Sequence, residues 1–401
     1  MNSTSIDAAF GDSKRHYPIL DGLRGVAALM VVAFHLFEAH APNRFEQLIN
    51  HGYLAVDFFF VLSGFVIGYA YDDRWQRMTF ADFCKRRLVR LHPMIVIAML
   101  IGALMFPFQA SGIFPKYAGA TAGDVLLALV VGMTLLPLPP SMDVRGWGEM
   151  HALNGPAWSL FFEYVANLLY ALVIRRFSNT ALAILVFVAG CALAQHTVWG
   201  PNGDVIGGWS LEPAQLQLGF TRLMYPFFAG LLLSRMVRPS RIAHSFPLCA
   251  LLVAAILAMP RVGGASTLWM NGLYEAVCII VLFPLVVWLG ASGAVAAGAP
   301  ARVCGVLGAI SYPLYIVHYP IVYTYTAWAV DGKVKLADGW PVALAAFGAS
   351  VALAWLCLTY YDVPLRRWLG RRLVEGRSGA RPVQAAAAAA GAADEASAPE
   401  R

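Results

Sequence analysis

The sequence predicts an all-α integral membrane protein, a polytopic helix bundle of about ten membrane-spanning helices. Hydrophobic residues make up 59% of the 401 residues, whereas charged residues make up only 13%. The mean hydropathy is +0.63, which is too high for a soluble globular protein of ordinary composition. Long apolar runs recur along most of the chain, so we expect helices that cross the bilayer one after another.

The basic residues do not indicate a nucleic-acid-binding protein. The formal net charge is +6, but Lys and Arg lie beside the apolar runs, where the retention of basic residues on the cytoplasmic side accounts for them. The six cysteines are scattered singly, and no two histidines lie three or four residues apart. We therefore interpret the cysteines as small hydrophobic residues and expect no bound metal.

Apolar segments long enough, or nearly long enough, to cross a bilayer occur eleven times. In chain order they cover residues 18–38, 53–71, 88–108, 123–138, 157–174, 181–196, 217–234, 246–260, 270–289, 304–326 and 341–360. Because Lys and Arg are retained in the cytoplasm, the loops between the segments indicate the direction of each span.

The loop charges indicate that one of the eleven segments does not cross. The loop after the second segment carries six basic residues between Arg74 and Arg90, which predicts a cytoplasmic N-terminus. If all eleven segments crossed, the basic residues at 175–176, 235–241 and 366–372 would all face outward. If one segment from the third to the fifth does not cross, all three basic clusters lie on the cytoplasmic side.

The segment 123–138 is the candidate for this exception, because it is short and ends in a proline-rich run. We expect it to be re-entrant or interfacial, which leaves ten spans with both termini in the cytoplasm. Its crossing the membrane stays an open alternative. We divide the chain into a disordered cytoplasmic tail over 1–16, a transmembrane domain over 17–370, and a cytoplasmic tail over 371–401 that is basic and then Ala-rich.

Four ionisable residues lie well inside the predicted spans, namely His35, Asp57, Glu163 and His318. Such a residue costs about 2.5–3.5 kcal/mol on insertion scales, so each one calls for a partner or a function. The predicted directions of the spans place all four in the outer half of the bilayer. We interpret them as one polar cluster, with a role in helix packing as the alternative for each residue.

The arginines lie in the other half of the predicted bundle. Arg24 is near the inner end of the first span, and Arg87 and Arg90 lie where the third helix starts. Arg24 and His35 are eleven residues apart, which places both on one helix face about 16 Å apart. Arg87 and Arg90 are three residues apart, so both guanidinium groups can point the same way and bind one polyanion. The sequence predicts a basic inner mouth opposite an outer cluster.

Five ordered motifs carry a resemblance to a known family. They read LDGLRGVAALMVVAFHLF, AVDFFFVLSGFVI, RRLVRLHP, GPAWSLFFEY and ISYPLYIVHYPI, and together they resemble the membrane-bound acyltransferase-3 family over about residues 17–370. The resemblance implies transfer of an acyl group, commonly acetyl from acetyl-CoA, to a hydroxyl of a sugar or another small acceptor. The usual LWSLSVEEQFY pattern of the family is altered here, with Phe161, Phe162 and Glu163 where the family often carries two successive acids.

The resemblance implies that Arg24, His35, Arg87 and Arg90 are functional. With the intramembrane residues, we predict a catalytic set, a donor-binding set and an acceptor-binding set. These are His35, Asp57 and Glu163; Arg24, Arg87 and Arg90; and Trp158, Ser159, Tyr312 and His318. His35 is expected to act as a general base on the acceptor hydroxyl, with Asp57 orienting its imidazole. A covalent acyl-histidine is an alternative.

The expected partners follow from the same resemblance. The donor is acetyl-CoA or another acyl-CoA from the cytoplasm, and the acceptor is an exported or cell-envelope polysaccharide or a glycolipid, in the bacterial cytoplasmic membrane. A small molecule such as an antibiotic sugar is an alternative acceptor. A proton-coupled transporter is the main alternative function, because intramembrane His, Asp and Glu also form proton relays. That function predicts inverted repeats, which the sequence does not show.

Overall fold

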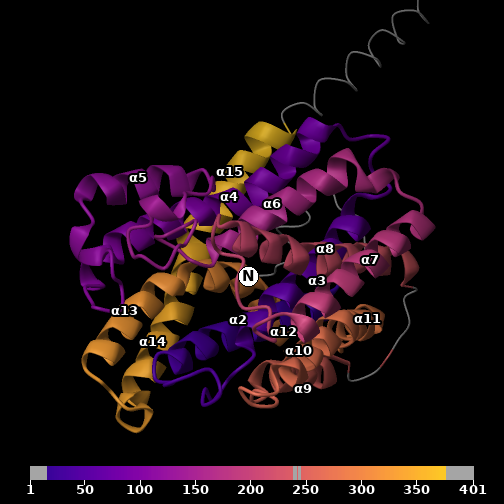
Figure 1. Cartoon of the computed structure of the whole chain (residues 1–401). Coiled ribbons are helices and arrows are strands. Elements are labelled where there is room, and N and C mark those ends of the chain that lie inside the picture. Colours follow the sequence, from indigo (N-terminus) through magenta and orange to yellow (C-terminus); the bar gives the residue numbers. More distant parts are fainter. Residues whose placement is uncertain (1–15, 238–241, 243–244, 376–401) are drawn as a thin grey trace, which may run out of the picture.

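The described part of the chain is helical, as the sequence predicts. The computed structural model describes residues 16–237, 242 and 245–375, and within these ranges the regular elements are helices packed side by side (Figure 1). The predicted tails over 1–16 and 371–401 lie outside the described residues, apart from His16 and the short helical stretch Arg371–Glu375.

The helices follow the predicted apolar segments. Their bounds are α2 (Pro18–Glu38), α3 (Ala55–Tyr71), α4 (Phe80–Met105), α5 (Ala122–Met133), α6 (Ala157–Leu172), α7 (Asn179–Trp199), α8 (Pro213–Met236), α9 (Ser245–Ala258), α10 (Leu268–Val277), α11 (Phe283–Ser292), α12 (Ala299–Val317), α13 (Tyr319–Asp331), α14 (Leu336–Leu356) and α15 (Val363–Gly370). Short π-helical turns join α10 to α11 and α14 to α15. Eight helices in the described ranges are long and apolar enough to cross a membrane, which confirms a polytopic helical membrane protein.

The segment predicted not to cross is short in the structure. α5 has 12 residues, about 18 Å at 1.5 Å per residue, which is less than the roughly 30 Å of a hydrocarbon core. A capping box formed by Thr121 and Asp124 begins the helix. α9 with 14 residues and α6 with 16 are also short, so the count of ten spans stays a prediction.

Glycines allow two pairs of helices to approach each other closely. α2 packs on α12 at Gly25, where an added Cβ would lie 2.4 Å from the carbonyl oxygen of Leu307. α3 packs on α8 at Gly64, where an added Cβ would lie 1.8 Å from the carbonyl oxygen of Phe227. A larger side chain at either glycine would push the helices apart. The close contact of α2 with α12 matters for the site, because polar residues of both helices meet along it.

The apolar segment predicted as one span over 304–326 is broken in the structure. α12 ends at Val317, α13 begins at Tyr319, and His318 lies between them. Pro320 has no backbone N–H to donate to the carbonyl of Ile316, and the side chain Nδ2 of Asn154 donates to that carbonyl instead at 2.6 Å. The predicted span therefore consists of two helices, because a proline interrupts the hydrogen bonds between them.

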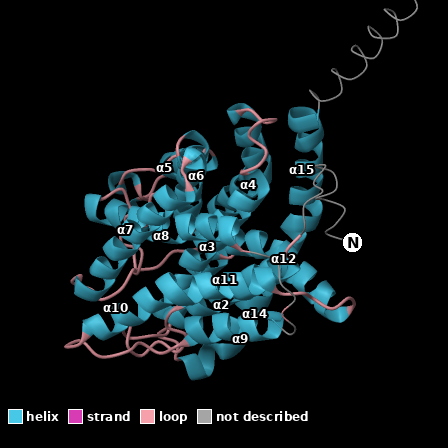
Figure 2. Cartoon of the chain, turned by 90° about the vertical axis from the view of Figure 1, so that its right-hand side faces the viewer, coloured by secondary structure: helices cyan, strands magenta, loops and turns pink. Residues whose placement is uncertain are grey.

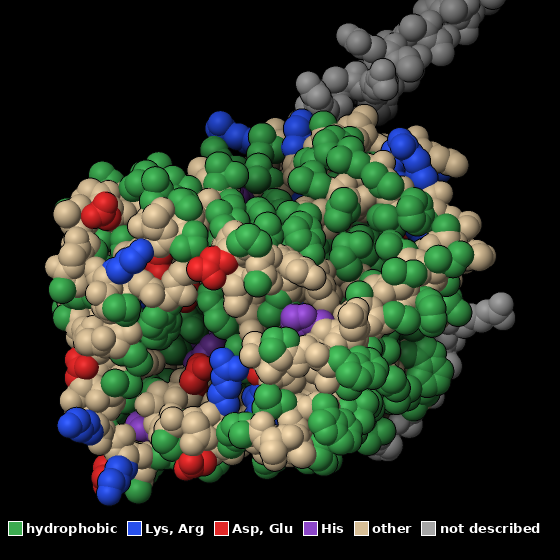
Figure 3. All heavy atoms as spheres, viewed as in Figure 1, with side chains coloured by type: hydrophobic (Ala, Val, Ile, Leu, Met, Phe, Trp, Pro, Cys, Tyr) green, Lys and Arg blue, Asp and Glu red, His purple; other side chains and the backbone are tan. Residues whose placement is uncertain are grey.

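The charged side chains are distributed unevenly over the bundle. Figures 1 and 2 place α15 at one end and α9 and α10 toward the other. On the face drawn in Figure 3, Lys and Arg side chains lie along the edge near α15, and large parts of the middle of that face are apolar. An apolar belt of this kind is expected where helices face lipid.

Candidate active site

The structure brings His35 and His318 together, although 282 residues follow between them in the sequence. His35 lies in the last turn of α2, and its ring stacks on that of His318 with 5.7 Å between centroids. Tyr319 packs edge-on against His35 at 4.8 Å. The Nδ1 atom of His35 lies 2.9 Å from Oε2 of Glu38. We call these four residues the histidine cluster.

Hydrogen-bond partners indicate the tautomer of each imidazole. An ionised carboxylate only accepts hydrogen bonds, so Nδ1 of His35 donates to Glu38 and Nε2 carries the lone pair. Nδ1 of His318 donates to the carbonyl of Leu314 at 3.0 Å. Nε2 of His318 is buried and has no hydrogen-bond partner among the described residues. Both rings therefore offer Nε2 as a proton acceptor.

The face drawn in Figure 3 is hollowed near α2 and α13, at the level where Figure 1 shows these helices side by side. A histidine lies inside this hollow, and acidic and basic side chains lie at its rim. His35 itself is partly exposed, with 17% of its side chain accessible. A reacting group can therefore approach an imidazole from outside the bundle.

Two predicted acceptor-binding residues, Trp158 and Ser159, lie in the first turn of α6, and Ser159 is linked to His318 through Tyr315. The hydroxyl of Tyr315 is 2.8 Å from Oγ of Ser159, and its ring lies 6.2 Å from that of His318. The guanidinium of Arg222 lies 5.1 Å from the ring centroid of Trp158. Sequence reasoning missed Tyr315, although it lies three residues before His318 and therefore on the same helix face.

Asp57 does not orient His35, which corrects the role predicted from the sequence. Its two carboxylate oxygens accept from Arg222 of α8, Oδ2 from Nη2 at 2.6 Å and Oδ1 from Nε at 3.2 Å. Both side chains are buried, and a buried carboxylate is stable when paired with an opposite charge. Arg222 also lies inside an apolar run, so its position in the sequence was an available signal. Glu38 is the carboxylate that contacts His35.

Glu163 contacts an arginine and is not part of the histidine cluster, contrary to the prediction of one polar cluster. Its Oε1 accepts from Nη2 of Arg87 at 2.6 Å and from Oγ of Ser63 at 2.8 Å. Tyr312 donates to the carbonyl of Leu91 in α4 at 2.6 Å, so it also packs on α4 and not on the acceptor side. Both contacts place Glu163 and Tyr312 against α4, so neither belongs to the histidine cluster.

Three arginines form a second group around two aspartates, Asp21 and Asp362. Nη2 of Arg24 lies 3.0 Å from Oδ1 of Asp21, and its Nε donates to Oγ of Ser311 in α12 at 2.8 Å. Arg366 pairs with Asp362 at 2.8 Å. Arg90 is exposed, and its charge acts on both aspartates. We call Arg24, Arg90 and Arg366 the basic group.

The spacing of Arg87 and Arg90 predicts that both side chains bind one partner. In the structure they have different partners. Arg87 is buried against Glu163, whereas Arg90 is exposed near Asp21 and Asp362. The difference arises because a separation of three residues still turns the side chains by about 60° around the helix. Arg90 is the member of the pair that a soluble polyanion can reach.

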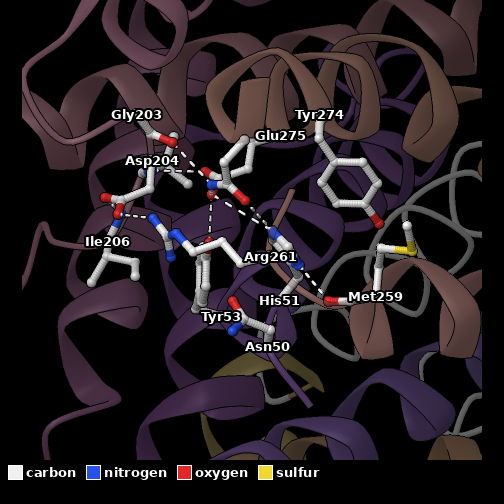
Figure 4. A network of polar contacts seen from close by, with 12 residues as sticks. Asn50, His51, Tyr53, Gly203, Asp204, Ile206, Met259, Arg261, Tyr274 and Glu275 are labelled. Atoms are coloured by element: carbon white, nitrogen blue, oxygen red, sulfur yellow. Dashed lines mark hydrogen bonds and ion pairs between the residues drawn. The ribbon is translucent and has the colours of Figure 1, made fainter. Parts of the chain in front are cut away.

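A further polar network, which the sequence did not predict, joins the segment just before α3 to α10 (Figure 4). Nε2 of His51 donates to Oδ1 of Asn271 at 2.9 Å, and Nδ2 of Asn271 donates to Glu275 at 2.7 Å. The hydroxyl of Tyr53 also donates to Glu275, and the backbone carbonyl of Tyr53 accepts from Arg222 at 2.9 Å. The network therefore holds the segment that positions the pair of Asp57 and Arg222. In the described ranges, no group of three or more His, Cys, Asp or Glu is placed to hold a metal ion.

The loop before α6 contributes a buried carboxyl close to the histidine cluster. The hydroxyl of Tyr323 donates to Oε2 of Glu149 at 2.5 Å, and the ring of Tyr323 packs on that of Tyr319 at 4.5 Å. Burial raises the pKa of Glu149 to about 8, although the charge of Arg145 opposes this shift. Glu149 therefore holds a proton near neutral pH in the folded protein.

We expect Glu149→Gln to remove part of the pH dependence of stability. The native state keeps a proton on Glu149 that the unfolded chain releases above about pH 4.5, so the free energy of unfolding contributed by this group falls as the pH rises from about 4.5 to 8. Glutamine is neutral throughout, so the variant should lose less stability across this window. Thermal unfolding in detergent at several pH values measures this, with Glu46→Gln at an exposed loop position as the control. An unchanged pH slope would contradict the prediction.

Comparison with known proteins identifies similar chains. The family described as "Acyltransferase domain" matches residues 17–359. O-acetyltransferase OatA of Staphylococcus aureus is 25% identical over 339 residues, which cover 81% of this chain and 53% of OatA. Acyltransferase MdmB of Streptomyces mycarofaciens is 27% identical over 386 residues, which cover 88% of this chain and 93% of MdmB.

A third relative matches over a shorter stretch. Protein 2 in picA locus of Rhizobium radiobacter is 38% identical over 160 residues, which cover 38% of this chain and 80% of that protein. The chain spans about half the length of OatA, since the match covers 53% of that protein. No solved structure matches the chain.

Proposed function

Because this chain belongs to the acyltransferase-3 family of membrane proteins, we propose that it transfers an acyl group from a coenzyme A thioester to a hydroxyl group of a carbohydrate. One observation carries the proposal. α2 bears two polar residues that each meet a partner from the α12 side, Arg24 at Ser311 and His35 at His318. The first contact adjoins the basic group, and the second is the core of the histidine cluster.

The separation of these two contacts suits a coenzyme A thioester. Arg24 and His35 are about 16 Å apart along α2, at 1.5 Å per residue. Coenzyme A carries anionic phosphates at one end and the thioester at the other, joined by a slender arm. Guanidinium groups of the basic group would bind the phosphates, and the arm would extend between the helices toward His35.

The chemistry at the histidine cluster is a general-base transfer. Nε2 of His35 takes the proton of the acceptor hydroxyl while the hydroxyl oxygen attacks the thioester carbonyl carbon. The carbon–sulfur bond then breaks, and coenzyme A leaves as a thiolate that takes up a proton. Nε2 of His318 has no partner among the described residues, so it is placed to accept a hydrogen bond from the acceptor. Formation of an acyl-histidine at His35 is a variant of the same proposal.

The predicted site residues divide between the two ends. Arg24 and Arg90 contact the donor. Arg87 is paired with Glu163, so it supports the packing of α4 and does not contact the donor. Ser159 is linked to His318 through Tyr315, and we assign it and the neighbouring Trp158 to the acceptor side. Asp57 supports the site through Arg222. We propose acetyl-CoA as the donor, supported by the relative named O-acetyltransferase.

We propose a polysaccharide or glycolipid of the cell envelope as the acceptor, and the bacterial cytoplasmic membrane as the location. Ten spans with both termini in the cytoplasm would place the basic group near the cytoplasmic face, where acyl-CoA is made. The histidine cluster would then lie in the outer half of the membrane, on the side to which envelope glycans are exported. The transporter alternative gives no reason for two contacts that match the two ends of a thioester donor.

The test is acyl transfer in inverted membrane vesicles supplied with labelled acetyl-CoA. The natural chain should place label on extracted glycan or glycolipid, whereas label in a water-soluble product instead would identify a small-molecule acceptor. Vesicles without the chain give the background. Absence of label above this background in every fraction would contradict the proposed function.

We expect Arg90→Ala to raise the KM for acetyl-CoA about 10-fold or more and to leave the rate at saturating donor nearly unchanged. A hydrogen bond to a charged group contributes about 1.5–3 kcal/mol, which corresponds to roughly 10- to 100-fold in affinity. Arg77→Ala removes another exposed arginine, from the segment just before α4, and is the matched control. A lowered rate at saturating donor with an unchanged KM would contradict the assignment of Arg90 to donor binding.

A further inference from the structure

We propose that Glu38 is a positioning residue of the transfer, which holds the imidazole of His35 in its reactive orientation and balances the charge that develops on it. This inference rests on the proposed function. Neither the family motifs nor the predicted sets include Glu38. It is the last residue of α2, three residues after His35, so the two side chains lie on the same helix face.

The first support is the geometry around the imidazole. Oε2 of Glu38 lies 2.9 Å from Nδ1 of His35. The ring of His318 stacks on one side at 5.7 Å, and Tyr319 packs edge-on at 4.8 Å. With Nδ1 bonded to Glu38 and the ring enclosed by its neighbours, Nε2 has one direction in which to meet a reacting hydroxyl.

The second support is electrostatic. The carbonyl groups at the C-terminal end of a helix make a negative charge unfavourable there, by about 0.3–1 kcal/mol. Glu38 lies at this end of α2, so the helix itself does not account for an acid at this position. The hydrogen bond to His35 offsets this cost, and it does so most strongly when the imidazole is protonated.

The third support is that the other nearby carboxylates are engaged elsewhere. Both oxygens of Asp57 accept from Arg222. Glu149 accepts from Tyr323. The titratable groups that face His35 are therefore Glu38 on its own helix and His318 and Tyr319 on the facing segment. Only Glu38 among them supplies a negative charge to the imidazolium.

The role in the reaction follows from these contacts. When Nε2 of His35 takes the hydroxyl proton, the ring gains a positive charge, and the proton on Nδ1 stays with the ring. The carboxylate of Glu38 is already in place to stabilise that charge, as carboxylates do in other histidine-dependent acyl transfers. No bond to Glu38 forms or breaks, so it acts through His35 and does not touch the substrate.

The experiment compares Glu38→Gln, Glu38→Ala and the natural chain in the labelled acetyl-CoA assay. We expect the rate at saturating donor to fall about 10-fold in Glu38→Gln and about 100-fold in Glu38→Ala, within the range that positioned acid–base groups contribute. The KM for acetyl-CoA should stay within about 2-fold in both variants. Glu46→Ala, at an exposed glutamate of the loop after α2, is the matched control and should keep the natural rate.

Chemical rescue separates positioning from a merely structural role. The side chain of Glu38 is 53% exposed, so a small carboxylate can enter the space that Glu38→Ala leaves. We expect formate to restore part of the rate of Glu38→Ala, and chloride at equal ionic strength to restore none. Natural rates in both variants, or a loss that formate does not reverse while the variant unfolds at a lower temperature, would overturn the inference. Absence of transfer by the natural chain would instead contradict the proposed function.

Discussion

Replacing His35 by alanine is expected to lower acyl transfer by about 100-fold or more, since a positioned general base contributes about 10²–10⁴-fold to a rate. His35 offers Nε2 to the acceptor because Nδ1 is bonded to Glu38, and alanine removes this proton acceptor altogether. The loss should appear in the rate at saturating donor and not in the KM for acetyl-CoA, because Arg24, the member of the basic group on α2, lies about 16 Å away along that helix.

The measurement is the initial rate of label transfer in membranes with matched amounts of each variant. His196→Ala is the control, because His196 also lies in the last turn of a long apolar helix, α7, and is not part of the histidine cluster. The thermal unfolding temperature in detergent shows whether His35→Ala still folds. A folded His35→Ala variant with the natural rate would exclude His35 from the chemistry.

Replacing Asp57 by alanine is expected to destabilise the fold by about 3–5 kcal/mol, because it leaves the buried guanidinium of Arg222 without its counter-charge. The pair is bidentate, at 2.6 Å and 3.2 Å, and both side chains are buried. Arg222 would keep its bonds to the carbonyls of Tyr53 and Gly207, which do not neutralise its charge.

The double variant Asp57→Ala with Arg222→Met separates a structural role from a catalytic one. Replacing a buried ion pair by apolar side chains is often neutral for stability, so the double variant should unfold at a higher temperature than Asp57→Ala. Recovery of both stability and transfer supports the structural role described here. Recovery of stability without transfer would restore the catalytic role that the sequence had predicted, and an Asp57→Ala variant as stable as the natural chain would contradict the account of the pair.

The fold class was predictable because hydropathy and loop charge act locally along the chain. The apolar segments correspond to helices, and the segment 123–138 is a helix of only 12 residues, α5, as its length and prolines indicate. The break at His318 was harder to predict, because apolar residues continue through it. It depends on Pro320, which has no N–H to donate to the carbonyl of Ile316, and on Asn154 of a distant loop, whose Nδ2 donates to that carbonyl instead.

Contacts in the site were predictable where they depend on the position of a residue along its span. They were not predictable where they depend on which helix a side chain faces. His35 and His318 were expected at one depth, and they stack in the structure. Asp57 was expected at the same depth, but it faces Arg222 of α8. Depth gives no information on the direction in which a side chain points around its helix, and that direction follows from the packing of α3 on α8.

Glu163 and Glu38 differ in whether the sequence could identify their partners. Glu163 pairs with Arg87 because α6 packs on α4, a tertiary contact that no spacing in the sequence reveals. Glu38 lies three residues after His35, so helical periodicity could have identified it. The sequence analysis predicts Asp57 as the partner of His35 instead, because Asp57 lies inside an apolar span whereas Glu38 ends one.

The most direct test of the central claim uses acetyl-CoA labelled with radioactive carbon in the acetyl group and with tritium in coenzyme A. Inverted vesicles that contain the chain receive this donor on their outer, originally cytoplasmic, face. The account predicts that the carbon label appears on a hydroxyl of the acceptor while the tritium stays outside the vesicles as free coenzyme A. Movement of both labels together into the vesicles, with no labelled acceptor, would contradict acyl transfer and indicate a transporter.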